Sequence, residues 1–231
     1  MRSVKTIFVK QAKDMFKNIG VLVQFIIFPV VALVMTRLIA IPNEDIPNGM
    51  FVTMMAAIFA GMGLIFSTAL IIAEDIENKS LRLLVMAGVK PHQYLLGVGG
   101  FILFAGTVTS VVFGLIGGFA GLELLKFLAI MITAAASSIV LGATIGILAK
   151  NQQAASGISM PIAMVIGFIP MIANFNETIE RIAVVLYTQQ LNVIVNDFNA
   201  NFTKAIAIMG VNISILTVLF ALAYGKKGLK G

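Results

Sequence analysis

Long apolar stretches without charge alternate with short polar segments along the whole chain. Each stretch is close to the roughly 20 residues that an α-helix needs to cross a hydrocarbon core. None of them alternates polar and apolar residues as a membrane β-strand does. The pattern therefore predicts an all-α, polytopic membrane protein that forms one domain over residues 1–231. Its six expected transmembrane helices cover about residues 19–39, 50–73, 95–119, 127–149, 154–173 and 205–224.

Composition supports this prediction. Hydrophobic residues make up 59% of the chain and charged residues 11%, and the mean hydropathy is +1.03. A soluble domain does not need so much apolar surface. Cysteine is absent, so the sequence offers no disulfide and no thiolate ligand. Histidines and carboxylates are not clustered, so we predict no metal site and no catalytic residue.

Basic residues lie mainly on one side of the expected spans. Of the 16 Lys and Arg residues, only Arg37, Lys126, Arg181 and Lys204 fall on the side opposite the two termini. Basic residues concentrate in cytoplasmic loops, so we expect both termini to be cytoplasmic in a multi-pass protein of the plasma membrane. This topology, with attraction to anionic lipid, also accounts for the net charge of +6. We therefore expect no nucleic-acid partner.

Residues 2–18 combine apolar residues at helical spacing with basic residues on the other faces. Ile7, Phe8 and Met15 belong to the apolar set, whereas Lys10 and Lys13 belong to the basic set. This pattern is typical of an amphipathic helix that lies in the membrane interface. A basic flank without defined structure is the alternative interpretation.

The expected cytoplasmic link between spans two and three carries a distinct pattern. It starts with three acidic residues, continues with apolar residues at i, i+3 and i+4 beside an arginine, and ends in glycine and proline, which stop helices. We predict a short amphipathic helix presented to the cytoplasm, and an ordinary solvated helix in a loop is the alternative. The residues that form the pattern are Glu74, Asp75, Glu77, Leu81, Arg82, Leu84, Val85, Gly88 and Pro91.

The segment 174–203, between spans five and six, is too long and too apolar for an ordinary exposed loop. Ile179, Ile182 and Ala183 share one face of a possible helix. We predict short helices on the extracellular side, and an interfacial lid without a gating role is the alternative.

Spans two and five carry the same order of methionine and phenylalanine at i, i+4, i+7 and i+11. Thioether and aromatic side chains adapt to apolar ligands of varied shape. Packing or lipid contact is the alternative function of such stripes. The two stripes are Met55, Phe59, Met62 and Phe66 in span two and Met164, Phe168, Met171 and Phe175 in span five.

The acidic start, the leucine-bearing helix, the Gly88-x-x-Pro91 spacing and Leu95-Leu96-Gly97 together resemble the coupling-helix region of the ABC type-2 exporter permeases. The number of spans and the helix before the first span are also similar to that family. Many of its members have Glu-Arg and Gly-Thr where this chain has Glu74-Asp75 and Lys79-Ser80.

The resemblance implies a function and a set of partners. Such a permease, here of a bacterial plasma membrane, works with a separate ABC ATPase subunit that binds ATP and Mg²⁺, and with a second permease copy or a paralogue. The link helix would couple to the ATPase, spans two and five would line the central pathway, and the helices after span five would close it from outside. The cargo would be hydrophobic or amphipathic, such as a drug, a peptide or a lipid.

Absent motifs bear on the alternatives. The sequence has no Gly-x-x-x-x-Gly-Lys-Ser/Thr loop, so we expect a translocase subunit that is not an enzyme by itself and binds no cofactor. No ionisable residue lies near the centre of a span, and ion-coupled carriers need such groups. The empty span centres therefore disfavour an ion-coupled transporter or channel, which is one alternative function, and a membrane scaffold or sensor is another.

Overall fold

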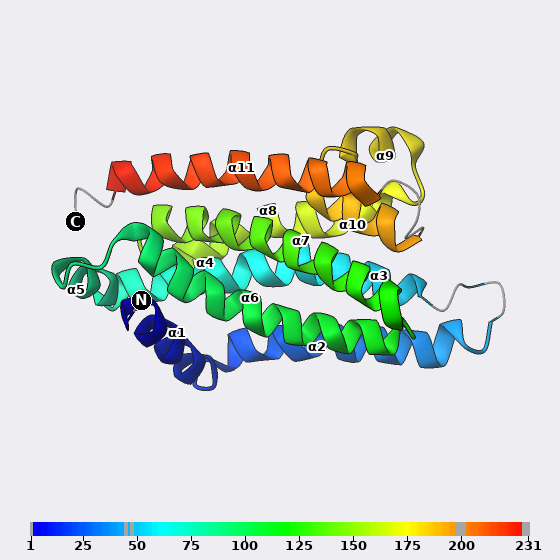
Figure 1. Ribbon diagram of the computed structural model, residues 1–231, viewed down its shortest axis with the longest axis horizontal. Coiled ribbons are helices and arrows are strands. Elements are labelled where there is room, and N and C mark those ends of the chain that lie inside the picture. Colours follow the sequence, from blue (N-terminus) through cyan, green and yellow to red (C-terminus); the bar gives the residue numbers. More distant parts are fainter. Residues whose placement is uncertain (1, 44–45, 47–48, 197–201, 228–231) are drawn as a thin grey trace.

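The computed structural model describes residues 2–43, 46, 49–196 and 202–227, and every regular element in these ranges is helical (Figure 1). Six helices of this part of the chain are long and apolar enough to cross a membrane, as a multi-pass membrane protein requires. The predictions of an all-α fold and of six such helices are confirmed. They are α2 (Ile19–Met35) with η1 (Thr36–Ala40), α3 (Met50–Ile58) with η2 (Phe59–Gly63) and α4 (Leu64–Glu77), α6 (Pro91–Ile116), α7 (Gly121–Leu148), α8 (Gln152–Ala173) and α11 (Phe202–Lys227).

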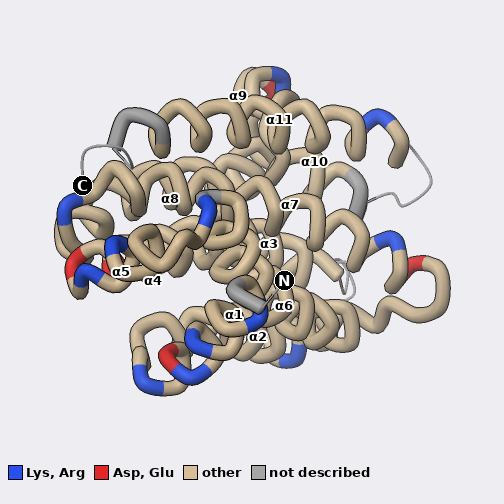
Figure 2. Tube along the Cα trace, turned by 60° about the vertical axis from the view of Figure 1, so that its left-hand side comes forward, with Lys and Arg blue, Asp and Glu red and all other residues tan. Residues whose placement is uncertain are grey.

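Four shorter helices lie outside these spans. They are α1 (Arg2–Met15), α5 (Ser80–Met86), α9 (Glu177–Ala183) and α10 (Tyr187–Asn196). Helices α1 and α5 lie at the same end of the bundle as the last turns of α11, and α9 and α10 lie at the other end (Figure 1). We call these the α5 end and the α9 end. Lysine, arginine and the acidic residues gather near the helix ends, with uncharged stretches between them (Figure 2).

Several helices extend beyond the apolar runs that predicted them. Helix α6 begins at Pro91 instead of about residue 95. Proline suits the first turn of a helix because the amide hydrogen that it lacks would have no partner there. The Gln93 side chain also accepts a hydrogen bond from the Lys90 amide at 3.1 Å. Local capping therefore sets this boundary, whereas hydropathy marks only the apolar part of the helix.

The second span is the most buried of the six and contacts most of the others. Helices α4 and α7 approach closely because α7 has glycine at the contact. A Cβ atom at Gly142 would lie 2.5 Å from the Ile65 carbonyl oxygen, so no larger residue fits without a shift of the helices. Spans one, five and six leave the largest share of their surface uncovered by this chain.

Helix α1 packs along α6. Ile7 and Gln11 are buried, and Ile7 sits so close to Gly97 that a Cβ atom there would be 2.6 Å away. The Phe8 and Phe101 rings meet edge to face at 5.6 Å. One face of the amphipathic helix is thus covered by the protein itself, which fixes α1 against the α5 end of the third span.

Candidate functional site

The turn between α4 and α5 has an unusual backbone. Lys79 adopts a left-handed conformation with φ 58°, which is uncommon for a residue with a side chain. Gly88 has φ 81° and follows α5, the position where helices often end in glycine. These two residues turn the chain sharply on either side of α5. The helix therefore stands apart from the axes of α4 and α6 (Figure 1).

Helix α5 divides its apolar residues between two faces. Leu81 and Leu84 are partly buried against the chain's own core. Leu83 and Met86 point away and are 66% and 76% exposed, and Val85 is also exposed. The sequence pattern put Leu84 on the apolar face of the helix, and in the structure this residue turns toward the core, whereas Leu83 and Met86 lie on the exposed side. Both of these residues are absent from the pattern that the sequence suggested.

The three acidic residues before α5 have three different partners. Glu74 accepts a hydrogen bond from the Asn18 amide at 3.2 Å, which ties span two to the start of span one. Glu77 accepts from the backbone amide of Gln152 at 3.0 Å, the first residue of α8. The base of α5 is thereby joined to span five.

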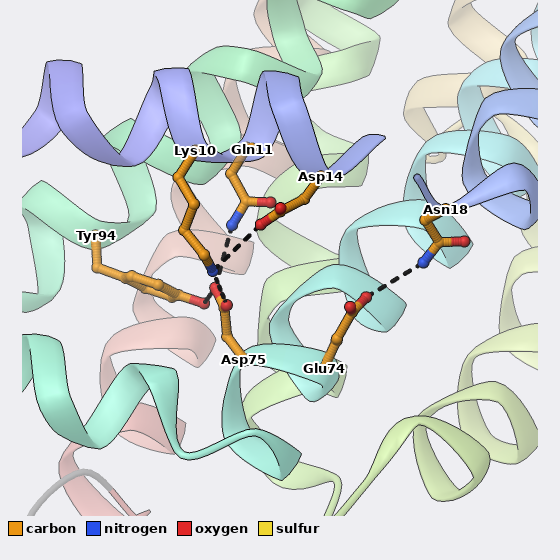
Figure 3. A network of polar contacts seen from close by, with 7 residues as sticks. All are labelled: Lys10, Gln11, Asp14, Asn18, Glu74, Asp75 and Tyr94. Carbon is orange, nitrogen blue, oxygen red and sulfur yellow. Dashed lines mark hydrogen bonds and ion pairs between the residues drawn. The ribbon is translucent and has the colours of Figure 1, made fainter. Parts of the chain in front are cut away.

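Asp75 is at the centre of a polar network that links α1, α4 and α6 (Figure 3). Its carboxylate pairs with the Lys10 ammonium and accepts hydrogen bonds from the Gln11 amide at 3.1 Å and the Tyr94 hydroxyl at 2.8 Å. Lys10 also pairs with Asp14 at 3.7 Å. The Asp75 side chain is only 5% exposed, and a buried carboxylate is stable only when such partners neutralise and solvate it.

Sequence analysis assigned Asp75 to the coupling segment but missed its partners. Lys10, Gln11 and Tyr94 are separated from Asp75 by 65, 64 and 19 positions in the chain. The sequence does indicate that Gln11 needs a polar partner. It follows Ile7 by four residues and so interrupts the apolar face of α1. Nothing in the local sequence identifies Asp75 as the residue that it meets.

Two open pockets flank the base of α5. One has a volume of about 440 Å³ and lies between α1, the start of α2 and the end of α4, with Lys17, Asn18, Glu74 and Ser80 among its lining residues. The other, of about 550 Å³, lies where α4 meets the start of α8. Both are lined mainly by polar residues, so this end of the bundle offers hydrogen-bonding surface around α5.

The methionine and phenylalanine stripes of spans two and five do not form a single surface. Phe59 is fully buried, and its ring lies 5.6 Å from Phe25 and 5.8 Å from Phe113, which belong to spans one and three. Met55 and Met171 pack against the same small cluster around Phe51. These two methionines are brought together by the fold, whereas Phe59 faces the core.

The other stripe residues occupy varied positions. Met62 is partly buried and contacts α8 at Gly167. Phe66 and Phe168 are partly buried. Met164 and Phe175 are exposed on the outside of the chain.

Within the described ranges, no group of three or more His, Asp or Glu residues is arranged to hold a metal ion. The contacts described above are apolar contacts, hydrogen bonds and the ion pairs of Lys10. Comparison of the sequence with models of protein families gives no match, and no curated protein is significantly similar to it.

Proposed function

We propose that this chain is the membrane-spanning permease subunit of an ABC exporter, driven by a separate ATPase subunit. The observation that carries the proposal is helix α5, a short helix between spans two and three whose outer face, Leu83 and Met86, is apolar and exposed. An exposed apolar face beside polar pockets favours a protein partner over water. On this proposal, α5, both termini and the α5 end are cytoplasmic.

The contacts around α5 give a route for mechanical coupling. Leu81 and Leu84 hold α5 against the bundle, Glu77 joins its base to span five, and Asp75 joins it to α1 and span three. A displacement of α5 by the ATPase would therefore reach spans two, three and five together. The ATPase would contact α5 differently in each of the ATPase's two nucleotide states. This difference would favour one of two arrangements of the spans in each state.

The cargo follows from what the spans offer. Of the stripe residues, Met164, Phe168 and Phe175 are not enclosed in the core and offer thioether and aromatic groups, and the spans carry no charge near their centres. A surface of this kind favours a hydrophobic or amphipathic molecule. A second permease subunit would cover part of the exposed faces of spans one and five, with Met164 and Phe175. ATP and Mg²⁺ would bind to the partner ATPase.

Copurification of an ATPase with the chain, followed by substrate-stimulated ATP hydrolysis in lipid nanodiscs, tests the proposal. Leu83→Asp and Met86→Asp should each weaken ATPase association by about tenfold or more, because a charge would enter an apolar contact without a partner. Ile182→Asp is the matched control, since Ile182 is 70% exposed on α9 at the opposite end. Equal association of all three variants would contradict the assignment of α5, and absence of any ATPase would contradict the function.

A further inference from the structure

Spans two and five cross at a pair of glycines. A Cβ atom at Gly61 would lie 2.6 Å from Gly167 Cα and 2.8 Å from Gly167 N, so the two backbones are in direct contact. Each helix also has an irregularity at this crossing. Span two passes through the π-helical segment η2 (Phe59–Gly63), and span five contains Pro170.

Each irregularity deprives one backbone carbonyl of its usual helical partner. In η2, the Leu64 amide donates to Phe59 O, whereas in an α-helix it would donate to Ala60 O. In α8, Ile166 O would accept from the amide of residue 170, but Pro170 has no amide hydrogen. Buried carbonyls without donors are costly, so Ala60 O and Ile166 O both require a donor from elsewhere.

Each carbonyl receives a side-chain donor, Ile166 O from the first turn of α10 and Ala60 O from Ser138 of α7, which in turn contacts α10. The Thr188 hydroxyl donates to Ile166 O at 2.8 Å. The Ser138 hydroxyl on α7 donates its only proton to Ala60 O, so the Tyr187 hydroxyl, 2.8 Å from Ser138 Oγ, is the donor in that contact. Burial raises the pKa of the Tyr187 phenol above its ordinary value, which keeps this proton in place. Tyr187 and Thr188 are both buried.

A third contact continues the same face of α10. Asn192 follows Thr188 by four residues, and its amide donates to Asn174 Oδ1 at 2.8 Å and to Pro170 O at 3.4 Å. The α10 helix is therefore fastened to span five at two levels and, through Ser138, to span two.

We propose that the first turn of α10 is a clasp that holds spans two and five crossed, with Tyr187 and Thr188 as the positioning residues. The helix irregularities supply the two acceptors, and separation of the spans at Gly61 and Gly167 requires a break in the series of contacts that runs from Ile166 O through α10 and Ser138 to Ala60 O. The role of the clasp in a transport cycle rests on the proposed function, whereas its hold on the crossing does not.

The absence of native cysteine makes the clasp measurable with one introduced thiol. Ala163 is fully buried in a cluster with Ile65 and Ala69 of α4 and lies one turn before Gly167 on the same face. Ala163→Cys therefore reports separation of the two spans through its rate of reaction with N-ethylmaleimide. The measurement uses the whole chain in nanodiscs without ATPase, so failure to find an ATPase would leave the result unaffected.

Tyr187→Phe and Thr188→Val each remove one hydrogen bond and should raise the reaction rate about three- to tenfold, and Ser138→Ala removes two and should raise it at least as much. The matched controls Thr217→Val and Ser214→Ala should leave the rate unchanged, because these hydroxyls bond only to carbonyls of their own helix, α11. Rates that are equal in all variants, or that rise equally in the controls, would overturn the clasp.

Two double variants test the geometry independently. Tyr187→Phe with Ser138→Ala should show no larger rate than Ser138→Ala alone, because Ser138→Ala already removes the contact that Tyr187→Phe would break. Pro170→Ala restores a backbone donor for Ile166 O, so Thr188→Val should have little effect in that background. Additive effects in the first pair, or an undiminished Thr188→Val effect in the second, would overturn the proposal even if one single variant fails to fold.

Discussion

The buried Asp75 network gives the most quantitative expectation for stability. Lys10→Met removes the ammonium group and keeps the aliphatic stem, leaving Asp75 with Gln11 and Tyr94 as its donors. Breaking a fully buried ion pair from one side costs about 3–5 kcal/mol, because the other charge is left without its partner. The Lys10 side chain is 37% exposed, so water can partly replace it, and we expect a smaller loss of about 2–3 kcal/mol.

For a chain of this size, that loss corresponds to a drop in melting temperature of roughly 5–10 °C. The sequence lacks both tryptophan and cysteine, so far-ultraviolet circular dichroism of the protein in nanodiscs is the suitable measurement. Lys13→Met is the control, since Lys13 is exposed on the same helix and should change stability by less than about 0.5 kcal/mol. The loss of stability in Tyr94→Phe should fall between those of Lys10→Met and Lys13→Met.

A double substitution separates the charge effect from the loss of contacts. Lys10→Met combined with Asp75→Met replaces both members of the pair by apolar groups, and such replacements are often close to neutral. The double variant should therefore be more stable than Lys10→Met alone. If Lys10→Met melts like Lys13→Met, or if the double variant is the least stable, the network does not hold α1 to the bundle as argued.

Four further expectations follow from the placement of other residues. Phe59→Ala should destabilise the protein by about 3–5 kcal/mol, because it opens a cavity among Phe25, Phe28 and Phe113. Phe168→Ala, at a partly buried position, should lower the melting temperature less and change substrate preference in a transport assay, and the opposite order would assign the span-five stripe to packing. Glu77→Ala should weaken the cap of α8 by about 0.5–2 kcal/mol and reduce substrate-stimulated ATPase activity. Glu77→Gln retains an acceptor for the Gln152 amide and should therefore keep most of that activity. Single cysteines replacing Arg82 and Arg181, both exposed, should react with an impermeant thiol reagent from opposite faces of the membrane, and labelling from the same face would contradict the predicted topology.

Some properties of this protein follow from local sequence alone. The six spans are determined by long uncharged runs, because a helix that crosses a bilayer must be apolar along about 20 residues wherever its neighbours lie. The amphipathic pattern of residues 2–18 and the stop signal at Gly88 and Pro91 are local in the same sense. They depend on side-chain periodicity and on backbone preferences within a few residues.

Other properties were decided by the tertiary structure. The pattern of α5 shows that it has apolar residues, but only its packing against the core turns Leu84 inward and leaves Leu83 and Met86 outside. Phe59 and Phe168 occupy equivalent places in matching stripes, yet Phe59 is enclosed by spans one and three, and Phe168 is not.

The polar contacts show the same division most clearly. Asp75 meets Lys10 and Gln11 from more than 60 positions away, and Thr188 meets the carbonyl that Pro170 leaves open on another helix. The sequence indicates that a carboxylate or a proline is present and that each needs a partner. Which residue becomes that partner depends on how the helices pack, because a buried polar group is satisfied by whatever donor the fold brings within about 3 Å.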